Sequence, residues 1–439
     1  MKLIRHQREE KGVRLSTESN PNQVPSPSEQ SRGHSAAGHV GLWLIGARGS
    51  VATTAATGLA AIRTGLAPAT GCVTSQDGFS SIPLPKFSDL IIGGHDISDV
   101  SIAKRAEYLV GAGMLSQHLV NALYEELEET DSRIRPGYDP SCRGESQAEA
   151  ARRLANDINE FKISHSLDRV VVIDVSSTEA PIDYLPEFDD IGLLLAALED
   201  PSRDILPPSS LSAYASILAE ASYICFTPSP SLNIPALRQL AAERGVPTAG
   251  QDGKTGQTWL RSVLAPGLAA RGLKVLSWSG ANLLGGGDGA TLADPQAVAG
   301  KLQSKNRGLQ SLTNGATTPL HIDNVPDLGE TKVAWDHINV EGFLGSRVTL
   351  QTTWSAYDSM LAAPMILDLA RLMGLADASG HRGPVGEFGF FFKDPWGSDE
   401  HSFAEQSRRL LEWAREAGTH VALERTNEKD ATQYGVGAR

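Results

Sequence analysis

Lysines beside small polar turns are the residues of this chain whose types and spacing could do chemistry. Lys254 lies in residues 252–258 (DGKTGQT), where a loop is expected to become a helix. Free backbone N–H groups at a helix start, with hydroxyls and an ammonium group beside them, suit a phosphate monoester. Lys301 and Lys305 are four residues apart, after the glycine-rich run 285–289, and would lie one above the other on a helix. A solvated lysine face is the alternative, but it does not account for the polar turns.

Two further lysines occupy comparable positions later in the chain. Lys332 ends the loop 326–332, and Lys393 ends the run 388–393 (FGFFFK), which we predict to be an apolar strand. A single lysine most often lies on the surface. Because these lysines stand beside glycine-rich or hydroxyl-rich turns, the pattern favours a site for an anionic substrate.

A buried strand, a glycine turn and a helix are predicted near the N-terminal end. Residues 40–45 form a continuous apolar run, typical of a parallel strand buried on both faces. Gly46 and Gly49 follow, and residues 51–63 are an alanine-rich helix. This order indicates the phosphate-binding unit of a dinucleotide fold, although G-x-G-x-x-G is incomplete. A strand–helix connection without function is the alternative, and Arg48 could reach a pyrophosphate or be exposed.

Polar residues also follow the next predicted strands. Residues 90–92 lead to Asp96, which could bond a ribose hydroxyl or cap the helix that follows. Residues 169–175 lead to Ser176 and Thr178. Strands alternate with helices in this part, so we predict an α/β fold with a Rossmann-type, doubly wound parallel sheet.

The pattern changes after residue 250. Residues 320–325 and 346–353 alternate apolar and polar side chains, which is the mark of half-buried antiparallel strands. Open sheets of this kind often pair across subunits, so we expect an oligomer. The predicted parts are a disordered tail (1–38), a Rossmann-like dinucleotide-binding domain (39–250 and 357–439), and an inserted α+β catalytic and oligomerisation domain (251–356).

The composition narrows the class of protein. The 439 residues carry a net charge of -13, which argues against nucleic-acid and membrane partners because these usually need a basic face. No apolar run approaches about 20 residues, so no membrane span is expected. Three widely spaced cysteines form no disulfide framework or metal spacing and suit a reducing cytosol. We therefore expect a cytoplasmic protein without a dedicated metal site.

Several motifs together resemble the myo-inositol-1-phosphate synthase family, also called inositol-3-phosphate synthases. DGKTGQT resembles the family's D-x-K-[ST]-G-Q-T, and residues 282–289 (NLLGGGDG) are similar to N-x-L-G-N-N-D-G. Residues 329–336 (GETKVAWD) resemble G-D-S-K-x-A-x-D, and residues 358–364 (DSMLAAP) resemble D-S-L-L-A-x-P. Lys301 and Lys305 fall at S-K-x-x-S-K, and Lys393 falls at the lysine before A-P. The resemblance is strong from about 250 to 370 and thinner elsewhere.

The resemblance implies a redox-neutral isomerase that uses NAD catalytically. Hydride leaves C5 of glucose 6-phosphate, the C5 ketone acidifies the C6 protons, C6 attacks the C1 aldehyde, and the hydride returns. Fixed ammonium groups in a dry site stabilise the oxyanions that form, and a lysine crowded by lysines can move protons near neutrality. Lys305 and Lys332 are assigned to the oxyanion or enolate and the C5 hydroxyl, and Lys301 and Lys393 to proton transfer and the C1 carbonyl.

The resemblance and the strand ends together give the other predicted site residues. The phosphate-binding residues are Lys254, Thr255, Gly256, Gln257 and Thr258. The NAD-binding residues are Gly46, Arg48, Gly49, Ser50, Val51, Asp96, Ser176, Thr178, Asp252, Gly287, Asp288 and Asp358. Asp288 and Asp358 are expected at the nicotinamide end, no metal is expected, and a homotetramer is expected.

The chain departs from the family pattern beside the predicted sugar site. Two family asparagines are Gly286 and Gly287 here, and a family histidine is Leu283. We favour neutral variation. The alternative is a sister cyclase that closes a smaller ring from a ketose such as fructose 6-phosphate. An inactive NAD-binding regulatory protein is the third hypothesis, against which the presence of all four lysines speaks.

Overall fold

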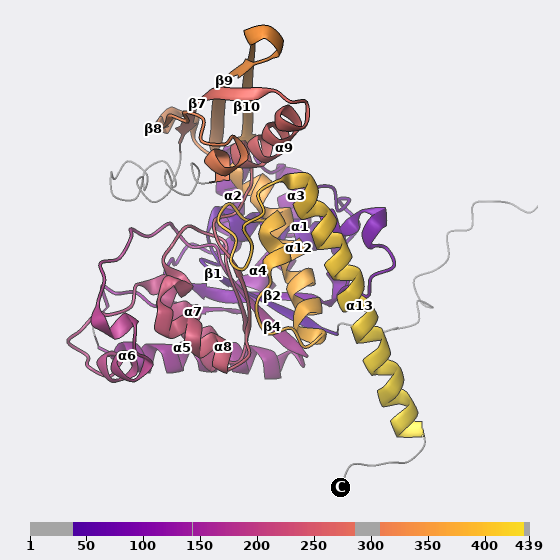
Figure 1. Cartoon of the computed structure of the whole chain (residues 1–439). Helices are drawn as coiled ribbons and strands as arrows, with labels where there is room; N and C mark the ends of the chain where they lie inside the picture. Colours follow the sequence, from indigo (N-terminus) through magenta and orange to yellow (C-terminus); the bar gives the residue numbers. More distant parts are fainter. Residues whose placement is uncertain (1–37, 143, 286–307, 434–439) are drawn as a thin grey trace, which may run out of the picture. The chain divides into compact units, whose positions relative to one another are not determined.

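The computed structural model describes residues 38–142, 144–285 and 308–433, with side chains described to residue 423. The predicted N-terminal tail therefore lies almost entirely outside the described residues. Figure 1 shows the chain coloured by sequence.

A seven-stranded parallel sheet forms the larger part of the described chain. Its strand order is β11-β6-β5-β4-β1-β2-β3, and every neighbouring pair is parallel. The order reverses between β1 and β4, so the sheet is doubly wound and has a topological switch point there. The predicted fold class is confirmed. The strands are β1 (Val40–Ile45), β2 (Leu90–Asp96), β3 (Ile134–Pro136), β4 (Arg169–Asp174), β5 (Ser222–Cys225), β6 (Pro247–Gly250) and β11 (Gly383–Pro384).

Helices cover both faces of this sheet, which is why its strands are apolar runs. In β1, Leu42 and Leu44 belong to the core that contains α1 (Ser50–Arg63) and α12 (Asp358–Ala378). Trp43 points to the opposite face, into the core that contains α5 (Gln147–Ser164). All three side chains are at most 1% exposed, so both faces gain hydrophobic stabilisation.

The remaining helices complete the two layers and link the sheets. They are α2 (Ile102–Gly111), α3 (Gln117–Ala122), α4 (Tyr124–Asp131), α6 (Ile191–Leu198), α7 (Pro208–Leu218), α8 (Pro235–Glu243), α9 (Gln257–Ala270) and α13 (Phe403–Gln433).

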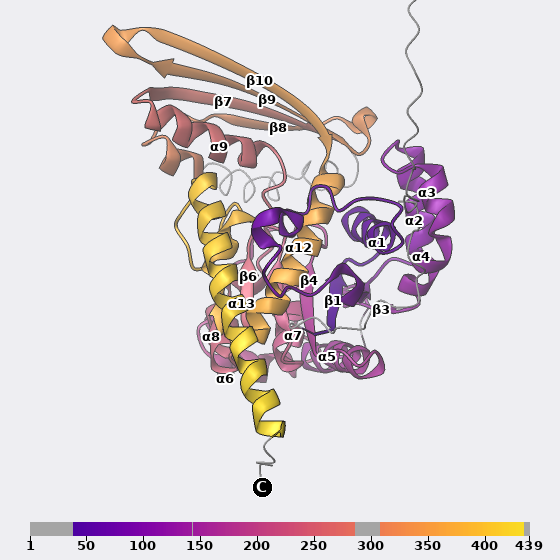
Figure 2. The same cartoon turned by 90° about the vertical axis from the view of Figure 1, so that its right-hand side faces the viewer.

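A second sheet has four strands in the order β10-β9-β7-β8. They are β7 (Lys274–Leu284), β8 (Leu320–Asn324), β9 (Thr331–Glu341) and β10 (Arg347–Tyr357). Figure 2 shows α9 lying along one face of this sheet, where Ala265 packs with Trp278 and Ile338. The pairs β7–β9 and β9–β10 are antiparallel.

Two local predictions in this part are wrong. Strand β8 pairs with β7 in parallel, and residues 285–319 between them are long enough for the crossover that parallel pairing needs. Residues 388–393 are not a strand, because the chain forms a 3-10 helix at Gly386–Phe390. Phe388, Phe391 and Phe392 are all at most 1% exposed, so the run is buried by a compact turn instead of by sheet pairing.

Helix α12 is the one helix of the described chain with the length and apolarity of a membrane-crossing segment. However, 72% of its most apolar stretch is buried inside the protein. It packs on α1, β4 and α13. Its apolarity is accounted for by its place in the core.

Candidate active site

A cavity of about 700 Å³ opens at the carboxyl ends of the parallel strands. Residues that follow β1, β2, β4 and β5 line it, as the switch-point rule for doubly wound sheets requires. Its volume lies within the usual range for cofactor and small-molecule sites. Thirteen of the predicted site residues line it: Gly46, Arg48, Gly49, Ser50, Val51, Asp96, Ser176, Thr178, Asp252, Thr255, Lys332, Asp358 and Lys393.

The turn after β1 requires glycine because it packs against the backbone that follows β4. Gly46 has a φ of +83°, and a Cβ on it would lie 2.8 Å from the Cα of Ser176. Helix α1 then begins at Ser50 without a capping side chain and without an acidic residue in its first turn. The positive end of α1 and its first N–H groups are therefore available to an anion.

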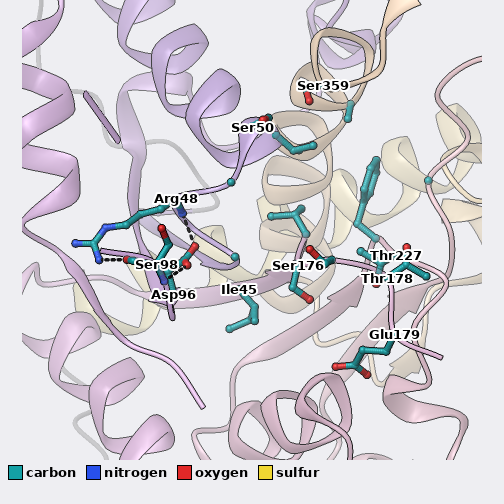
Figure 3. Close-up of a pocket in the computed structure, with 18 of the residues that line it drawn as sticks. Ile45, Arg48, Ser50, Asp96, Ser98, Ser176, Thr178, Glu179, Thr227 and Ser359 are labelled. Carbon is teal, nitrogen blue, oxygen red and sulfur yellow. Dashed lines mark hydrogen bonds between the residues drawn. The ribbon is translucent and has the colours of Figure 1, made fainter. Parts of the chain in front are cut away.

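Asp96 and Arg48 hold the neighbouring loop together. The Asp96 carboxylate accepts the backbone N–H groups of Arg48 and Ser98, both at 2.7 Å. The Arg48 guanidinium pairs with both carboxylate oxygens of Asp131 at 2.9 Å and donates to the Ser98 carbonyl at 2.7 Å. Figure 3 shows Arg48 extending away from Ser50 and Ser176. Arg48 is thus neither simply exposed nor directed along the glycine turn, and Asp96 keeps further lone pairs for a ribose hydroxyl.

One buried and one half-buried carboxyl group support the wall formed after β4. Asp174 is fully buried and accepts the hydroxyl and the N–H of Ser176 at 2.6 and 3.0 Å; burial raises its pKa. Glu179 accepts the N–H of Ser209 at 2.8 Å and its hydroxyl at 2.5 Å. Burial raises the pKa of Glu179 to about 7. Ser176 is therefore held in place by Asp174, and Glu179 ties the wall to the start of α7.

Two lysine–carboxylate pairs face the same cavity. The Nζ of Lys393 lies 2.7 Å from Oδ1 of Asp252, and the Lys393 N–H donates to the Asp252 carbonyl at 2.8 Å. The Nζ of Lys332 lies 3.0 Å from Oδ2 of Asp358. The Thr255 hydroxyl donates to the other oxygen of Asp358 at 2.6 Å. Lys332 is in strand β9, not in the loop predicted for it.

The rest of the predicted phosphate loop lies beside this cavity and not in its wall. Gln257 donates to both oxygens of Asp336 at 3.0 Å and accepts from Asn282 at 2.7 Å. Lys254 donates to the Gln406 side chain at 2.5 Å and to the Gly389 carbonyl at 3.2 Å. Burial, together with the smaller effect of the Lys393 charge, lowers the pKa of Lys254 to about 7. A Cβ on Gly256 would lie 2.2 Å from the ring of Trp354, so only glycine fits there.

The structure does not place four of the predicted site residues. Lys301, Lys305, Gly287 and Asp288 lie outside the described residues, so the structure says nothing of them. Within the described ranges, no group of three or more His, Cys, Asp or Glu side chains could hold a metal ion.

Sequence reasoning did not assign several residues that shape the site. Asp131 fixes Arg48, and Asp336 fixes Gln257 and Arg261. Asp336 was visible as the last letter of GETKVAWD, whereas nothing in the sequence marks Asp131 or Arg261.

Comparisons with known proteins agree with this architecture. The family model for myo-inositol-1-phosphate synthase matches residues 40–415. Inositol-3-phosphate synthase 1 of Bacteroides thetaiotaomicron is 30% identical over 399 residues, covering 83% of this chain and 91% of the relative. The Drosophila melanogaster enzyme is 31% identical over 317 residues, which are 66% of this chain and 54% of that protein.

Solved structures show the same fold. The crystal structure of inositol-3-phosphate synthase from Caenorhabditis elegans aligns with a TM-score of 0.77 and 26% identity, covering 86% of each chain. The family match, the relatives and the two-sheet architecture lead to one conclusion: the chain belongs to the myo-inositol-1-phosphate synthase family.

Proposed function

We propose that this protein converts glucose 6-phosphate to 1D-myo-inositol 3-phosphate and uses NAD without net oxidation. The observation that carries the proposal is the placement of Lys332 and Lys393, each paired with a carboxylate, in the wall of the cavity at the switch point. One cavity thus combines a dinucleotide-binding turn with the ammonium groups that an enolate needs.

The residues around the switch point fit NAD. The uncapped start of α1 suits a pyrophosphate. Asp96 lies at the end of β2, where an acid bonds an adenosine ribose, and Ser176 lies directly against Gly46 of the turn. When bound, NAD takes a hydride from a substrate carbon and later gives it back.

Lys332 and Lys393 act on the oxygens of the substrate. They are 5% and 7% exposed, and in such a dry site a fixed ammonium group stabilises an oxyanion strongly. We assign Lys332 to the oxygen on C5, which carries the enolate charge while a C6 proton is removed. We assign Lys393 to the oxygen on C1, which becomes an alkoxide and takes a proton when C6 attacks C1. Asp358 and Asp252 hold the two Nζ atoms in place.

The start of α9 is proposed to hold the substrate phosphate. The helix is capped by Gly256, which supplies no side-chain hydrogen bond, and its first turn has no acidic residue. Residues 255–258 therefore offer backbone N–H groups, and Thr258 a hydroxyl, to a dianion, as the loop sequence predicts. The Thr255 hydroxyl connects this loop to Asp358.

The decisive test is product analysis with two substrates. Purified protein is incubated with glucose 6-phosphate or fructose 6-phosphate, with and without NAD, and phosphorylated products are identified by NMR. Cyclised product from glucose 6-phosphate only when NAD is present is the expected result. A cyclised product from the ketose alone would establish the sister cyclase, and NAD binding without any product would establish a regulatory protein.

A pair of variants tests the lysine assignment. Lys332→Met is expected to abolish cyclisation while leaving the Kd for NAD within a few-fold of wild type. Lys274→Met is the matched control, because Lys274 is an exposed residue at the start of β7 in the same sheet. Full activity of Lys332→Met would remove this lysine from the mechanism.

We also propose a cytoplasmic homotetramer assembled through the second sheet. Strand β10 is an edge strand of eleven residues, and long exposed edges favour pairing with another chain. The face opposite α9 presents Trp335, and the β9–β10 connection presents Phe343 and Leu344, which are 86% and 90% exposed. Light scattering of wild type and Leu344→Asp tests this, with a lower mass expected for the variant; a monomeric wild type would overturn it.

A further inference from the structure

We propose that Arg261 and Thr258 jointly bind one oxygen of the substrate phosphate in a small cavity beside α9. This inference rests on the proposed function only in naming the phosphate of a sugar phosphate as the ligand. Both residues bind the ligand through side-chain donors, in addition to the backbone N–H groups at the start of the helix. Arg261 is a residue that the loop motif does not include.

Arg261 is buried with one side of its guanidinium unused. Its Nε and Nη2 donate to Oδ1 of Asp336 at 3.1 and 2.7 Å. The residue is 2% exposed, and its Nη1 has no hydrogen-bond partner. Leaving a charged donor unsatisfied in the interior is costly, so an ordinary structural arginine would place all its nitrogens on acceptors. The free nitrogen indicates an acceptor that belongs to a ligand.

Thr258 gives the second, independent observation. Its hydroxyl is also buried and also lacks a hydrogen-bond partner. Thr258 and Arg261 are three residues apart on α9, so they share one face of the helix. Both line the same small cavity. Two unpartnered donors therefore belong to residues that line one cavity beside the first turn of α9.

The charges around the cavity favour an anion over water. The described residues that line it include the cation Lys393 in addition to Arg261, and none of its lining residues is a carboxylate. Burial lowers the pKa of Lys254 and of His401, which also line it. Glu400 interacts with Lys254 and His401 from outside this lining. A phosphate oxygen accepts hydrogen bonds only, and it can satisfy the guanidinium and the hydroxyl together. The cavity has a volume of about 10 Å³, enough for one such oxygen.

Because Asp336 binds one edge of the guanidinium, this contact requires a planar donor with nitrogens on more than one edge. Asp336 is fully buried, and Trp278 donates to it at 2.8 Å from another side. The guanidinium is therefore locked in one orientation, with its remaining nitrogen fixed in space. A lysine at this position could pair with Asp336 but could not also reach the cavity with a rigid fork.

The experiment measures binding of inorganic phosphate and glucose 6-phosphate to the NAD-loaded protein by calorimetry. Arg261→Lys keeps the charge beside Asp336, and Thr258→Val keeps the shape while removing a hydroxyl that has no partner in the described structure. Each is expected to raise the Kd for phosphate about ten- to hundred-fold, the range for a hydrogen bond to a charged group. Arg271→Lys, at the exposed end of the same helix, is the matched control and should bind phosphate like wild type.

The two variants keep the test decisive. Thr258→Val should unfold at the wild-type temperature or above it, since it loses no hydrogen bond, so it gives an answer even if Arg261→Lys is unstable. Phosphate affinity unchanged in Thr258→Val, or in a folded Arg261→Lys, overturns the inference. Weaker phosphate binding in the variants supports it even if wild type forms no cyclised product, which would refute only the proposed function.

Discussion

The buried ammonium group of Lys254 should make the stability of this protein depend on pH in a way that Lys254→Met removes. Lys254 is 6% exposed and donates to an amide oxygen and a carbonyl oxygen, so no carboxylate contacts its ammonium group directly. Burial lowers its pKa from 10.5 to about 7. The folded protein therefore binds this proton less readily than the unfolded chain does.

The sign and the size follow from proton linkage. Between about pH 7 and 10.5 the unfolded chain holds the proton and the folded protein does not, so the free energy of unfolding rises with pH by about 1.4 kcal/mol per pH unit. Below pH 7 the folded protein carries the full cost of the buried charge, about 5 kcal/mol. Methionine has no proton to lose, so the stability advantage of Lys254→Met over wild type should shrink by roughly 2 to 3 kcal/mol from pH 8 to pH 10.

Urea unfolding of wild type and variant, followed by tryptophan fluorescence at pH 8 and pH 10, measures this difference. Comparing the two proteins at each pH cancels the titration of all other groups. Lys274→Met, at an exposed lysine, should show no such change between the two pH values. A difference between wild type and Lys254→Met that is the same at pH 8 and pH 10 would refute the reasoning.

Three further predictions concern the carboxyl groups. Lys393→Met leaves Asp252 buried without its ammonium partner and should lower the free energy of unfolding by about 3 kcal/mol or more. Adding Asp252→Asn to this variant should restore part of the lost stability, as measured by thermal unfolding. Asp96→Ala should weaken NAD binding at least about ten-fold by calorimetry, because the loop loses two backbone hydrogen bonds. Burial raises the pKa of Glu179 to about 7, so the folded protein keeps this proton at pH values where the unfolded chain has lost it. Wild type should therefore lose stability relative to Glu179→Gln as the pH rises from 4.5 to 7, as measured by urea unfolding. A difference in unfolding free energy that does not change with pH would contradict this prediction.

The parallel sheet was predictable because the composition of each strand reflects how that strand is buried. Residues 40–45 and 170–173 are runs without polar side chains since both faces are covered by helices. The polar residues that follow them could be assigned to one crevice because parallel strands end at one edge of a sheet. Asp96, Ser176 and the glycine turn were therefore found from sequence and line the cavity.

The side-chain partners in the site could not be predicted in the same way, because they join residues far apart in the chain. Arg48 pairs with Asp131 and the Gln257 amide pairs with Asp336, and neither partner is near its residue in the sequence. The phenylalanines of residues 388–393 suggested a strand, but three of them are buried on every side. Burial on all sides removes the alternation that separates a strand from a turn.

Asp358 links two elements that are far apart in the chain but contribute to the same site. One oxygen accepts the Thr255 hydroxyl from the predicted phosphate loop, and the other accepts the Lys332 ammonium group from β9. A carboxylate held at both oxygens by different elements has one orientation, so the distance between the loop and the lysine is fixed before any substrate arrives. Because preorganised charges cost little reorganisation when an oxyanion forms, the value of this carboxylate lies in the geometry that it imposes on Lys332. The same reasoning predicts that Thr255→Val lowers kcat more than it raises KM for glucose 6-phosphate. If steady-state kinetics give Thr255→Val the kcat and the KM of wild type, Asp358 needs only the lysine to hold its orientation.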